Sequence, residues 1–116
     1  MDTTDADLYK RQHGLNLKVP YSVGVIGCGG VGAWVGWGFG MSGVQEITLV
    51  DHDVVSESNL NRTPYEKIHI GQPKAESLAT ILIARRDMTV TPITERVENI
   101  PLSYFEKLEL IIDCRD

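Results

Sequence analysis

The stretch that decides the fold is Tyr21-Ser-Val-Gly-Val-Ile-Gly-Cys-Gly-Gly-Val-Gly32. Its first half, Tyr21–Ile26, is a short apolar run typical of a buried strand. The glycine-rich turn from Gly27 to Gly32 leads into an expected helix that reaches about Met41, where Ser42-Gly43 supplies the usual glycine stop. The pattern therefore predicts a strand, a tight turn and a helix in direct succession.

Further strands and a second helix are expected downstream. We expect strands at Glu46–Val50, at Met88–Ile93, where Pro92 indicates an edge or a bulge, and at Leu108–Ile112. A helix is expected at about Pro73–Arg86, with Pro73 at its first position. Strands that alternate with helices predict an α/β fold, a three-layer Rossmann-like βαβ arrangement with a mostly parallel sheet. We expect this domain to occupy residues 21–116, after an N-terminal helical segment at 1–20.

Composition excludes several classes of protein. A chain of 116 residues holds one core, and its net charge of −5 argues against a nucleic-acid binder. No run of 18 apolar residues predicts a membrane span, and the polar, acidic N-terminus does not resemble a secretory signal. The two cysteines, Cys28 and Cys114, show no CxxC spacing and predict neither a zinc site nor a disulfide framework. We expect a reduced, cytoplasmic setting.

The turn Gly27-Cys-Gly-Gly-Val-Gly32 matches GxGxxG directly after a strand and at the start of a helix. Glycines allow the backbone to approach a phosphate closely, and the helix N-terminus offers free N–H groups and a partial positive charge. The next strand ends at Asp51, about twenty residues further on, where a carboxylate can accept the hydroxyls of a ribose. Together these features predict a nucleotide site.

The choice of nucleotide depends on the long connection between Asp51 and Pro73, which shows little periodicity and follows the carboxyl end of a strand. Asn59, Arg62 and Lys74 lie on it or just after it. Lys74 is in the first turn of the expected helix, where the macrodipole disfavours a cation by roughly 0.3–1 kcal/mol. Such a position is understandable if Lys74 reaches a polyphosphate, so these residues favour a triphosphate over NAD.

Four motifs, in order along nearly the whole chain, resemble those of the ThiF/MoeB and ubiquitin-activating family. They are Tyr9-Lys-Arg11-Gln12, Asp51-His-Asp-Val-Val-Ser-Glu-Ser-Asn-Leu-Asn-Arg62, Gly71-Gln-Pro-Lys-Ala-Glu76 and Asp113-Cys-Arg-Asp116. The resemblance implies an enzyme that uses ATP to adenylate the C-terminal glycine carboxylate of a ubiquitin-like or sulfur-carrier protein ending in Gly-Gly. It does not identify that carrier protein or the pathway.

The resemblance also implies roles for particular residues. The implied nucleotide-binding set is Gly27, Gly29, Gly30, Gly32, Asp51, Asp53, Asn59, Arg62 and Lys74, in which the glycines form the phosphate turn, Asp51 holds the ribose, and Asn59, Arg62 and Lys74 hold the phosphates. The implied catalytic set is Arg11, Arg62, Lys74 and Asp116, with Asp116 organising Mg²⁺ and Arg11 reaching across the interface of a homodimer.

Two departures from the family pattern keep alternatives open. Thr63 stands where the family usually has glutamine, and the sequence stops at Asp116, before the family's second half. We therefore expect an apparently truncated fold, and the chain alone could be a non-catalytic nucleotide-binding partner or fragment of such an enzyme. An NAD-dependent oxidoreductase domain is the remaining alternative, based on GxGxxG and Asp51 alone.

Overall fold

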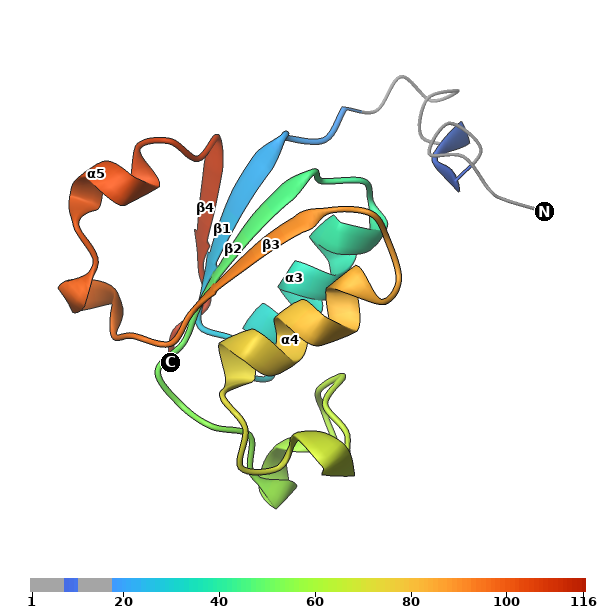
Figure 1. Cartoon of the computed structure of the whole chain (residues 1–116), viewed down its shortest axis with the longest axis vertical. Coiled ribbons are helices and arrows are strands. Elements are labelled where there is room, and N and C mark those ends of the chain that lie inside the picture. Colours follow the sequence, from blue (N-terminus) through green and yellow to red (C-terminus); the bar gives the residue numbers. More distant parts are fainter. Residues whose placement is uncertain (1–7, 11–17) are drawn as a thin grey trace.

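The computed structural model describes residues 8–10 and 18–116. The strands are β1 (Ser22–Ile26), β2 (Glu46–Val50), β3 (Thr89–Ile93) and β4 (Leu110–Asp113), and the helices of the sheet region are α3 (Gly32–Met41), α4 (Lys74–Ile83) and α5 (Leu102–Phe105). Figure 1 shows them as a twisted sheet with α3 and α4 against one face and α5 at the other. The expected N-terminal helical segment lies mostly outside the described residues.

The described strands form one parallel sheet in the order β3-β2-β1-β4. The chain runs outward from β1 to β2 and β3, then crosses back over the sheet to place β4 on the free side of β1. The direction of strand order therefore changes between β1 and β4, and ligands of such sheets bind beyond the carboxyl ends of the strands at this point. The expected α/β, Rossmann-like parallel sheet is confirmed, as is the edge position of the proline-containing strand.

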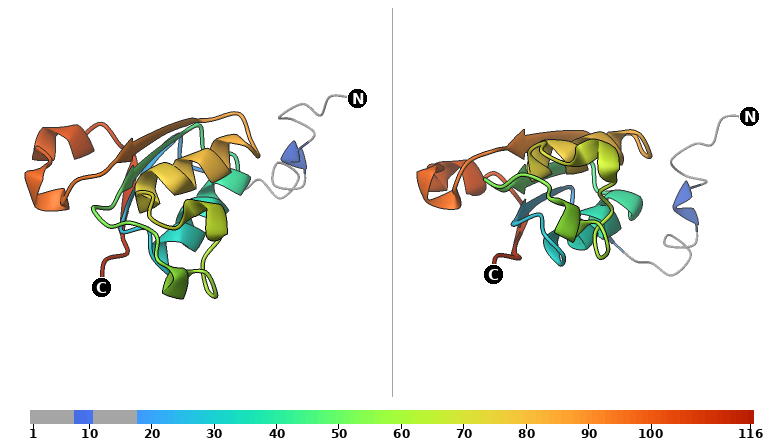
Figure 2. Two further views of the ribbon diagram at one scale, coloured as in Figure 1. Left: turned by 60° about the horizontal axis from the view of Figure 1, so that its bottom comes forward. Right: turned by 90° about the horizontal axis from the view of Figure 1, so that it is seen from below.

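Alternating side chains divide the core between the two faces of the sheet. Val23 and Val25 of β1, with Ile47 and Leu49 of β2, point into the larger cluster beneath α3 and α4. On the other face a smaller cluster contains Ile26 and Val50 from the strands together with Phe105 of α5. Figure 2 shows the two groups of helices on opposite sides of the sheet, which gives the three layers.

Helix α3 lies unusually close to its neighbours because its inner face carries glycines. A Cβ on Gly36 would lie 3.2 Å from Cδ2 of Leu78, and a Cβ on Gly40 would lie 3.1 Å from Cδ2 of Leu82. Both leucines belong to α4 and are fully buried. Each glycine destabilises the helix by about 1 kcal/mol relative to alanine. The glycines therefore lower the local stability of α3 but allow close packing between α3 and α4.

Several expected boundaries differ from those in the structure. Helix α4 begins at Lys74, because Pro73 has an extended ψ of 136° and serves as the N-cap, and it ends at Ile83 rather than Arg86. Strand β4 begins at Leu110, which pairs with Val23 of β1, because the N–H of Leu108 donates to Phe105 O at 3.1 Å in the turn after α5. The Leu108 side chain packs in the smaller cluster, with its Cδ1 2.7 Å from where a Cβ of Gly24 would be. No helix was expected at α5, which Phe105 anchors to the sheet.

The long connection between β2 and α4 is ordered. It contains two short 3₁₀ helices, Glu57–Asn59 and Lys67–His69. Its two ends are held side by side, because Val55 N–H donates to Gln72 O at 2.8 Å and Lys74 N–H donates to Asp53 O at 3.0 Å. The connection therefore returns the chain to the carboxyl end of the sheet, where α4 starts beside Asp53. No described helix is long and apolar enough to span a membrane.

Candidate functional site

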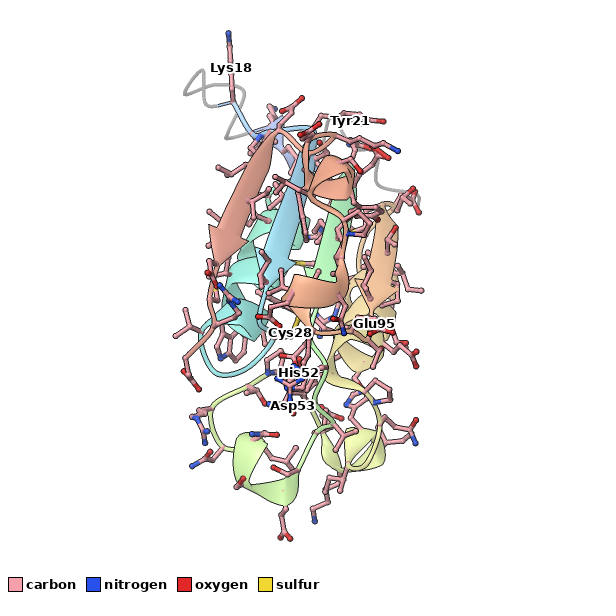
Figure 3. All side chains as sticks on the ribbon, turned by 90° about the vertical axis from the view of Figure 1, so that its left-hand side faces the viewer. Lys18, Tyr21, Cys28, His52, Asp53 and Glu95 are labelled. Carbon is pink, nitrogen blue, oxygen red and sulfur yellow. The ribbon has the colours of Figure 1, made fainter. Side chains whose placement is uncertain are left out.

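A cavity of about 380 Å³ lies at the carboxyl end of the sheet. Its wall includes seven of the residues expected from the sequence: Gly27, Gly29, Gly30, Asp51, Asp53, Lys74 and Asp116. Figure 3 shows Cys28, His52, Asp53 and Glu95 gathered at this end of the sheet, while Lys18 and Tyr21 lie at the opposite end. The cavity coincides with the change in strand order between β1 and β4, the position at which open α/β sheets bind ligands.

The glycine turn forms the floor of this cavity, and its backbone conformation and packing require glycine at two positions. Gly27 has a φ of +93°, a conformation open to glycine but strained for other residues. A Cβ on Gly32 would lie 1.6 Å from the carbonyl oxygen of Gly27, so the first turn of α3 presses directly on the end of β1. Within the described chain, no protein acceptor takes the N–H groups of Gly29 and Gly30, which leaves them free for an anion.

Asp51 connects β2 to the glycine turn. Its Oδ2 accepts the N–H of Cys28 at 2.7 Å, and its Oδ1 accepts the N–H of Asp53 at 2.7 Å. These two bonds fix the direction of the side chain. Because each carboxylate oxygen keeps a further lone pair, it can still accept hydrogen bonds from hydroxyl groups of a ligand in the cavity. The neighbouring His52 Nε2 lies 3.4 Å from Asp53 Oδ1.

The expected cations occupy different positions. Lys74 lines the cavity from the first turn of α4. Arg62 does not line it, although its Nε is 3.3 Å from the position of a Cβ on Gly30, directly beside the glycine turn. The Nη1 of Arg62 donates to Ser58 O at 2.8 Å, and this bond holds the arginine side chain against the long connection that carries it.

Two further expected residues do not line the cavity in the described structure. Asn59 is buried, and its Oδ1 accepts the N–H of Ser56 at 2.8 Å, so it caps the first 3₁₀ helix of the loop. Gly32 supports the turn from below, as its contact with Gly27 shows. Arg11 lies outside the described residues.

One wall of the cavity was missed in the sequence. It consists of Glu95, Arg96, Val97 and Glu98, which follow β3, and of Arg115, which follows β4. Each comes within a few residues of the carboxyl end of a strand, and this position along the chain is the signal that could have found them. Arg115 donates from Nη2 to Asp113 Oδ2 at 2.8 Å and lowers the pKa of that carboxyl to about 2, chiefly through the side-chain hydrogen bonds.

Tyr65 was also missed. It is buried in the middle of the long connection, and its hydroxyl donates to the carbonyl oxygen of Cys28 at 2.6 Å. Burial raises the pKa of its phenol, so the hydroxyl keeps its proton. No periodicity marks this residue, because the loop that carries it has neither a helical nor a strand repeat.

Neither cysteine has the properties of a nucleophile. Cys28 is fully buried beneath the glycine turn, and desolvation raises the pKa of its thiol far above neutral pH. Desolvation also raises the pKa of Cys114. A reactive thiol must ionise readily, so Cys28 serves as a small apolar group in the core and Cys114 packs, partly buried, against it. The described residues contain no group of three or more His, Cys, Asp or Glu side chains able to hold a metal ion.

The sequence pattern of the ThiF family matches residues 12–116. The chain belongs to the ThiF family. The match covers the glycine turn, Asp51, the long connection and the strand-end segment Asp113–Asp116, which are the parts of the chain that meet at the cavity. The family resemblance inferred from the sequence motifs is therefore confirmed.

Several characterised relatives are longer than this chain. The molybdopterin-synthase adenylyltransferase of Salmonella typhimurium is 38% identical over 96 residues, which cover 79% of this chain and 38% of that protein. The SAMP-activating enzyme E1 of Haloferax volcanii is 34% identical over 111 residues, 84% of this chain and 40% of that protein. The matched part of the chain thus covers about two fifths of each of these relatives.

Solved structures agree with this assignment. The E. coli tRNA N6-threonylcarbamoyladenosine dehydratase in complex with ATP superposes with a TM-score of 0.84 at 26% identity, over 100% of this chain and 53% of that one. E. coli MccB, crystallised with AMPCPP and MccA, superposes with a TM-score of 0.66 at 26% identity, over 79% of this chain and 29% of that one.

Proposed function

We propose that this chain forms the Mg-ATP-binding part of an enzyme that adenylates the C-terminal carboxylate of a ubiquitin-like or sulfur-carrier protein. The observation that carries the proposal is the cavity itself, where the free N–H groups of the glycine turn, the fixed carboxylate of Asp51 and the ammonium of Lys74 face one space of about 380 Å³. The named activities of the relatives support the same reaction class.

The reaction needs positioning and charge neutralisation more than covalent chemistry from the protein. A carboxylate oxygen of the acceptor attacks the α-phosphorus of ATP, the bond from that phosphorus to the bridging oxygen of the β-phosphate breaks, and pyrophosphate leaves with the electron pair. The product is an acyl-adenylate. Gly29 and Gly30 offer N–H groups to the phosphates, Lys74 offers a positive charge, and Asp51 holds the ribose hydroxyls.

ATP fits these residues better than NAD does. A dinucleotide site of this kind uses the helix N-terminus and a carboxylate, and it needs no lysine at the mouth of the phosphate turn. Lys74 occupies an unfavourable place in the first turn of α4, and Arg62 lies against the same turn at Gly30. Both cations are explained by a ligand with several phosphates.

Mg²⁺ fits the carboxylates of the site. Mg²⁺ in nucleotide enzymes takes one or two carboxylates together with phosphate oxygens and water, rather than a complete cage of protein ligands. Asp116 lines the cavity and is the carboxylate we assign to this ion, which when bound neutralises part of the phosphate charge.

The partners of the reaction follow from the same proposal. The acceptor is a protein that ends in Gly-Gly, and the working enzyme is a cytoplasmic homodimer in which Arg11 reaches the partner's site. The partly exposed Trp34, whose Nε1 donates to Arg62 O at 2.7 Å, offers apolar surface that a second subunit would cover.

Calorimetry with Mg-ATP, AMP and NAD tests the nucleotide part of the proposal. We expect Mg-ATP to bind and NAD to bind at least tenfold more weakly. Tight NAD binding without ATP binding would reject the proposal in favour of an oxidoreductase. Exchange of labelled pyrophosphate into ATP, with added proteins that end in Gly-Gly, tests adenylation. Nucleotide binding without any exchange would favour a non-catalytic nucleotide-binding partner.

A further inference from the structure

The hydroxyl of Tyr65 lies at a junction of the three segments that build the phosphate end of the cavity. It donates to Cys28 O of the glycine turn at 2.6 Å and lies 3.3 Å from Lys74 O at the start of α4. Tyr65 itself belongs to the long connection and is only 2% exposed. One buried phenol therefore joins the turn, the helix that carries Lys74 and the loop that carries Arg62.

The bond to Cys28 fixes the direction of the next N–H group. The peptide between Cys28 and Gly29 is planar and trans, so its carbonyl and its N–H point in opposite directions. While Tyr65 holds the carbonyl, the N–H of Gly29 must point away from the phenol. Gly29 lines the cavity, and Tyr65 does not.

The rest of the turn shows why this bond is needed. The N–H of Cys28 is held by Asp51, and the carbonyl of Gly29 accepts the N–H of Ala33 at 2.9 Å. The peptide that joins Cys28 to Gly29 is held by the Tyr65 hydroxyl. Because Gly29 has no Cβ, the backbone torsions on its side of this peptide can change easily. Without the hydroxyl, a buried carbonyl would lose its partner and this peptide could rotate.

We propose that Tyr65 is a positioning residue for nucleotide phosphates: it orients the Gly29 N–H toward the cavity and keeps Lys74 in register with the glycine turn. The inference rests on the proposed ATP site and adds to it a residue that does not touch the ligand. A purely structural Tyr65 would affect all ligands of the cavity alike, whereas a positioning residue affects those that carry phosphates.

The test compares Tyr65→Phe with Tyr104→Phe. The first variant removes only the hydroxyl at the junction, and the second removes a hydroxyl from α5 in the smaller cluster, on the other face of the sheet. Calorimetry measures the affinity of each protein for Mg-ATP and for adenosine. We expect Tyr65→Phe to weaken Mg-ATP about tenfold and adenosine less than about twofold, with Tyr104→Phe unchanged for both. Equal losses for the two ligands, or no loss, would overturn the inference.

Two measurements without nucleotide separate this inference from the proposed function. Amide hydrogen exchange and NMR shifts at Gly29 and Gly30 should change in Tyr65→Phe and stay as in the wild type in Tyr104→Phe. In the wild-type protein the Tyr65 hydroxyl proton should exchange slowly enough to be seen by NMR. A protein that fails to bind ATP but shows both effects would reject the proposed ligand and keep the orienting role. An unchanged turn and an invisible hydroxyl proton would reject the orienting role itself.

Discussion

The guanidinium of Arg115 joins the segments that follow the two edge strands of the sheet, because its Nη1 lies 3.2 Å from Oε1 of Glu98. Glu98 follows β3 and Arg115 follows β4, and these strands are the outermost in the order β3-β2-β1-β4. The same guanidinium binds Asp113 at 2.8 Å. The ion pairs are exposed and contribute little stability individually, but they hold the two segments of one cavity wall together.

The titration of Asp113 should report this contact. Its pKa in the folded protein is about 2, below the ordinary 3.8, because Arg115 hydrogen-bonds the charged form. The stabilisation by the carboxylate is complete above about pH 4 and declines as the pH falls from 3.8 toward about 2. In an NMR titration of the Asp113 carboxyl carbon, Arg115→Ala should raise the midpoint toward 3.8.

Glu98→Gln is the matched control for that titration. It removes the second carboxylate partner of Arg115 and leaves the hydrogen bonds to Asp113 intact, so the Asp113 pKa should stay near 2. A midpoint that does not move in Arg115→Ala would contradict the assigned cause of the low pKa.

Two glycines of the same helix should respond in opposite ways to alanine. A Cβ at Gly32 would lie 1.6 Å from Gly27 O, whereas a Cβ at Gly38 would meet nothing within 4 Å. We expect Gly32→Ala to lower the free energy of unfolding by at least about 3 kcal/mol, because backbone must move. Gly38→Ala should raise it by about 0.5–1 kcal/mol through helix propensity. Urea denaturation measures both, and a tolerated Gly32→Ala would show that α3 does not press on β1.

The sequence predicted the parts of the fold that depend on neighbours along the chain. The strand, glycine turn and helix from Ser22 to Met41 follow from a local pattern, and so does β2 with Asp51 at its end. The start of β4 could not be predicted in this way. Leu108 is as apolar as the strand residues after it, but its N–H donates to Phe105 O in the turn after α5, and its side chain packs near Gly24, far away in sequence.

The candidate site likewise contains residues that local sequence patterns predict and residues that only the path of the chain brings together. Gly29, Asp51 and Lys74 were predicted to meet because each follows a strand or starts a helix in a familiar pattern, and the structure brings them to one cavity. The wall from Glu95 to Glu98 was missed because its proximity to Arg115 arises from the crossing of the chain over the sheet. Asn59 was expected at the phosphates and stays a prediction there; in the structure its Oδ1 accepts the N–H of Ser56 within the loop.

A complementation experiment tests the proposed sharing of Arg11 between subunits. In the enzyme of which this chain forms the Mg-ATP-binding part, Arg11→Ala and Asp116→Ala should each abolish exchange of pyrophosphate into ATP, because one lacks the arginine and the other the carboxylate assigned to Mg²⁺. A mixed dimer contains one site with both residues intact if Arg11 acts in the partner's site. We therefore expect the mixture to recover at most about half of the wild-type activity per dimer. Mixed dimers that form without recovery would place Arg11 in its own subunit's site or outside the reaction.

Lys74 should show two opposite effects when it is replaced by alanine. In the nucleotide-free protein its charge lies in the first turn of α4, at the positive end of the helix dipole, so Lys74→Ala should leave stability unchanged or raise it by about 0.3–1 kcal/mol. With ligand present the same change removes a cation from the wall of the cavity. Because a hydrogen bond to a charged group is worth about 1.5–3 kcal/mol, Mg-ATP affinity should fall roughly tenfold to a hundredfold.

AMP distinguishes the target of the Lys74 side chain. If the ammonium binds the distal phosphates, AMP affinity should fall less than about threefold in Lys74→Ala, since AMP lacks those groups. Lys67→Ala, in the exposed second 3₁₀ helix of the long connection, is the matched control and should change neither affinity. Thermal unfolding of each variant without ligand, with Mg-ATP and with AMP gives the stability and both affinities in one series, because a ligand stabilises the folded state by an amount that grows with the logarithm of its concentration divided by its Kd. Equal losses of affinity for ATP and AMP would indicate that the Lys74 ammonium binds the α-phosphate instead.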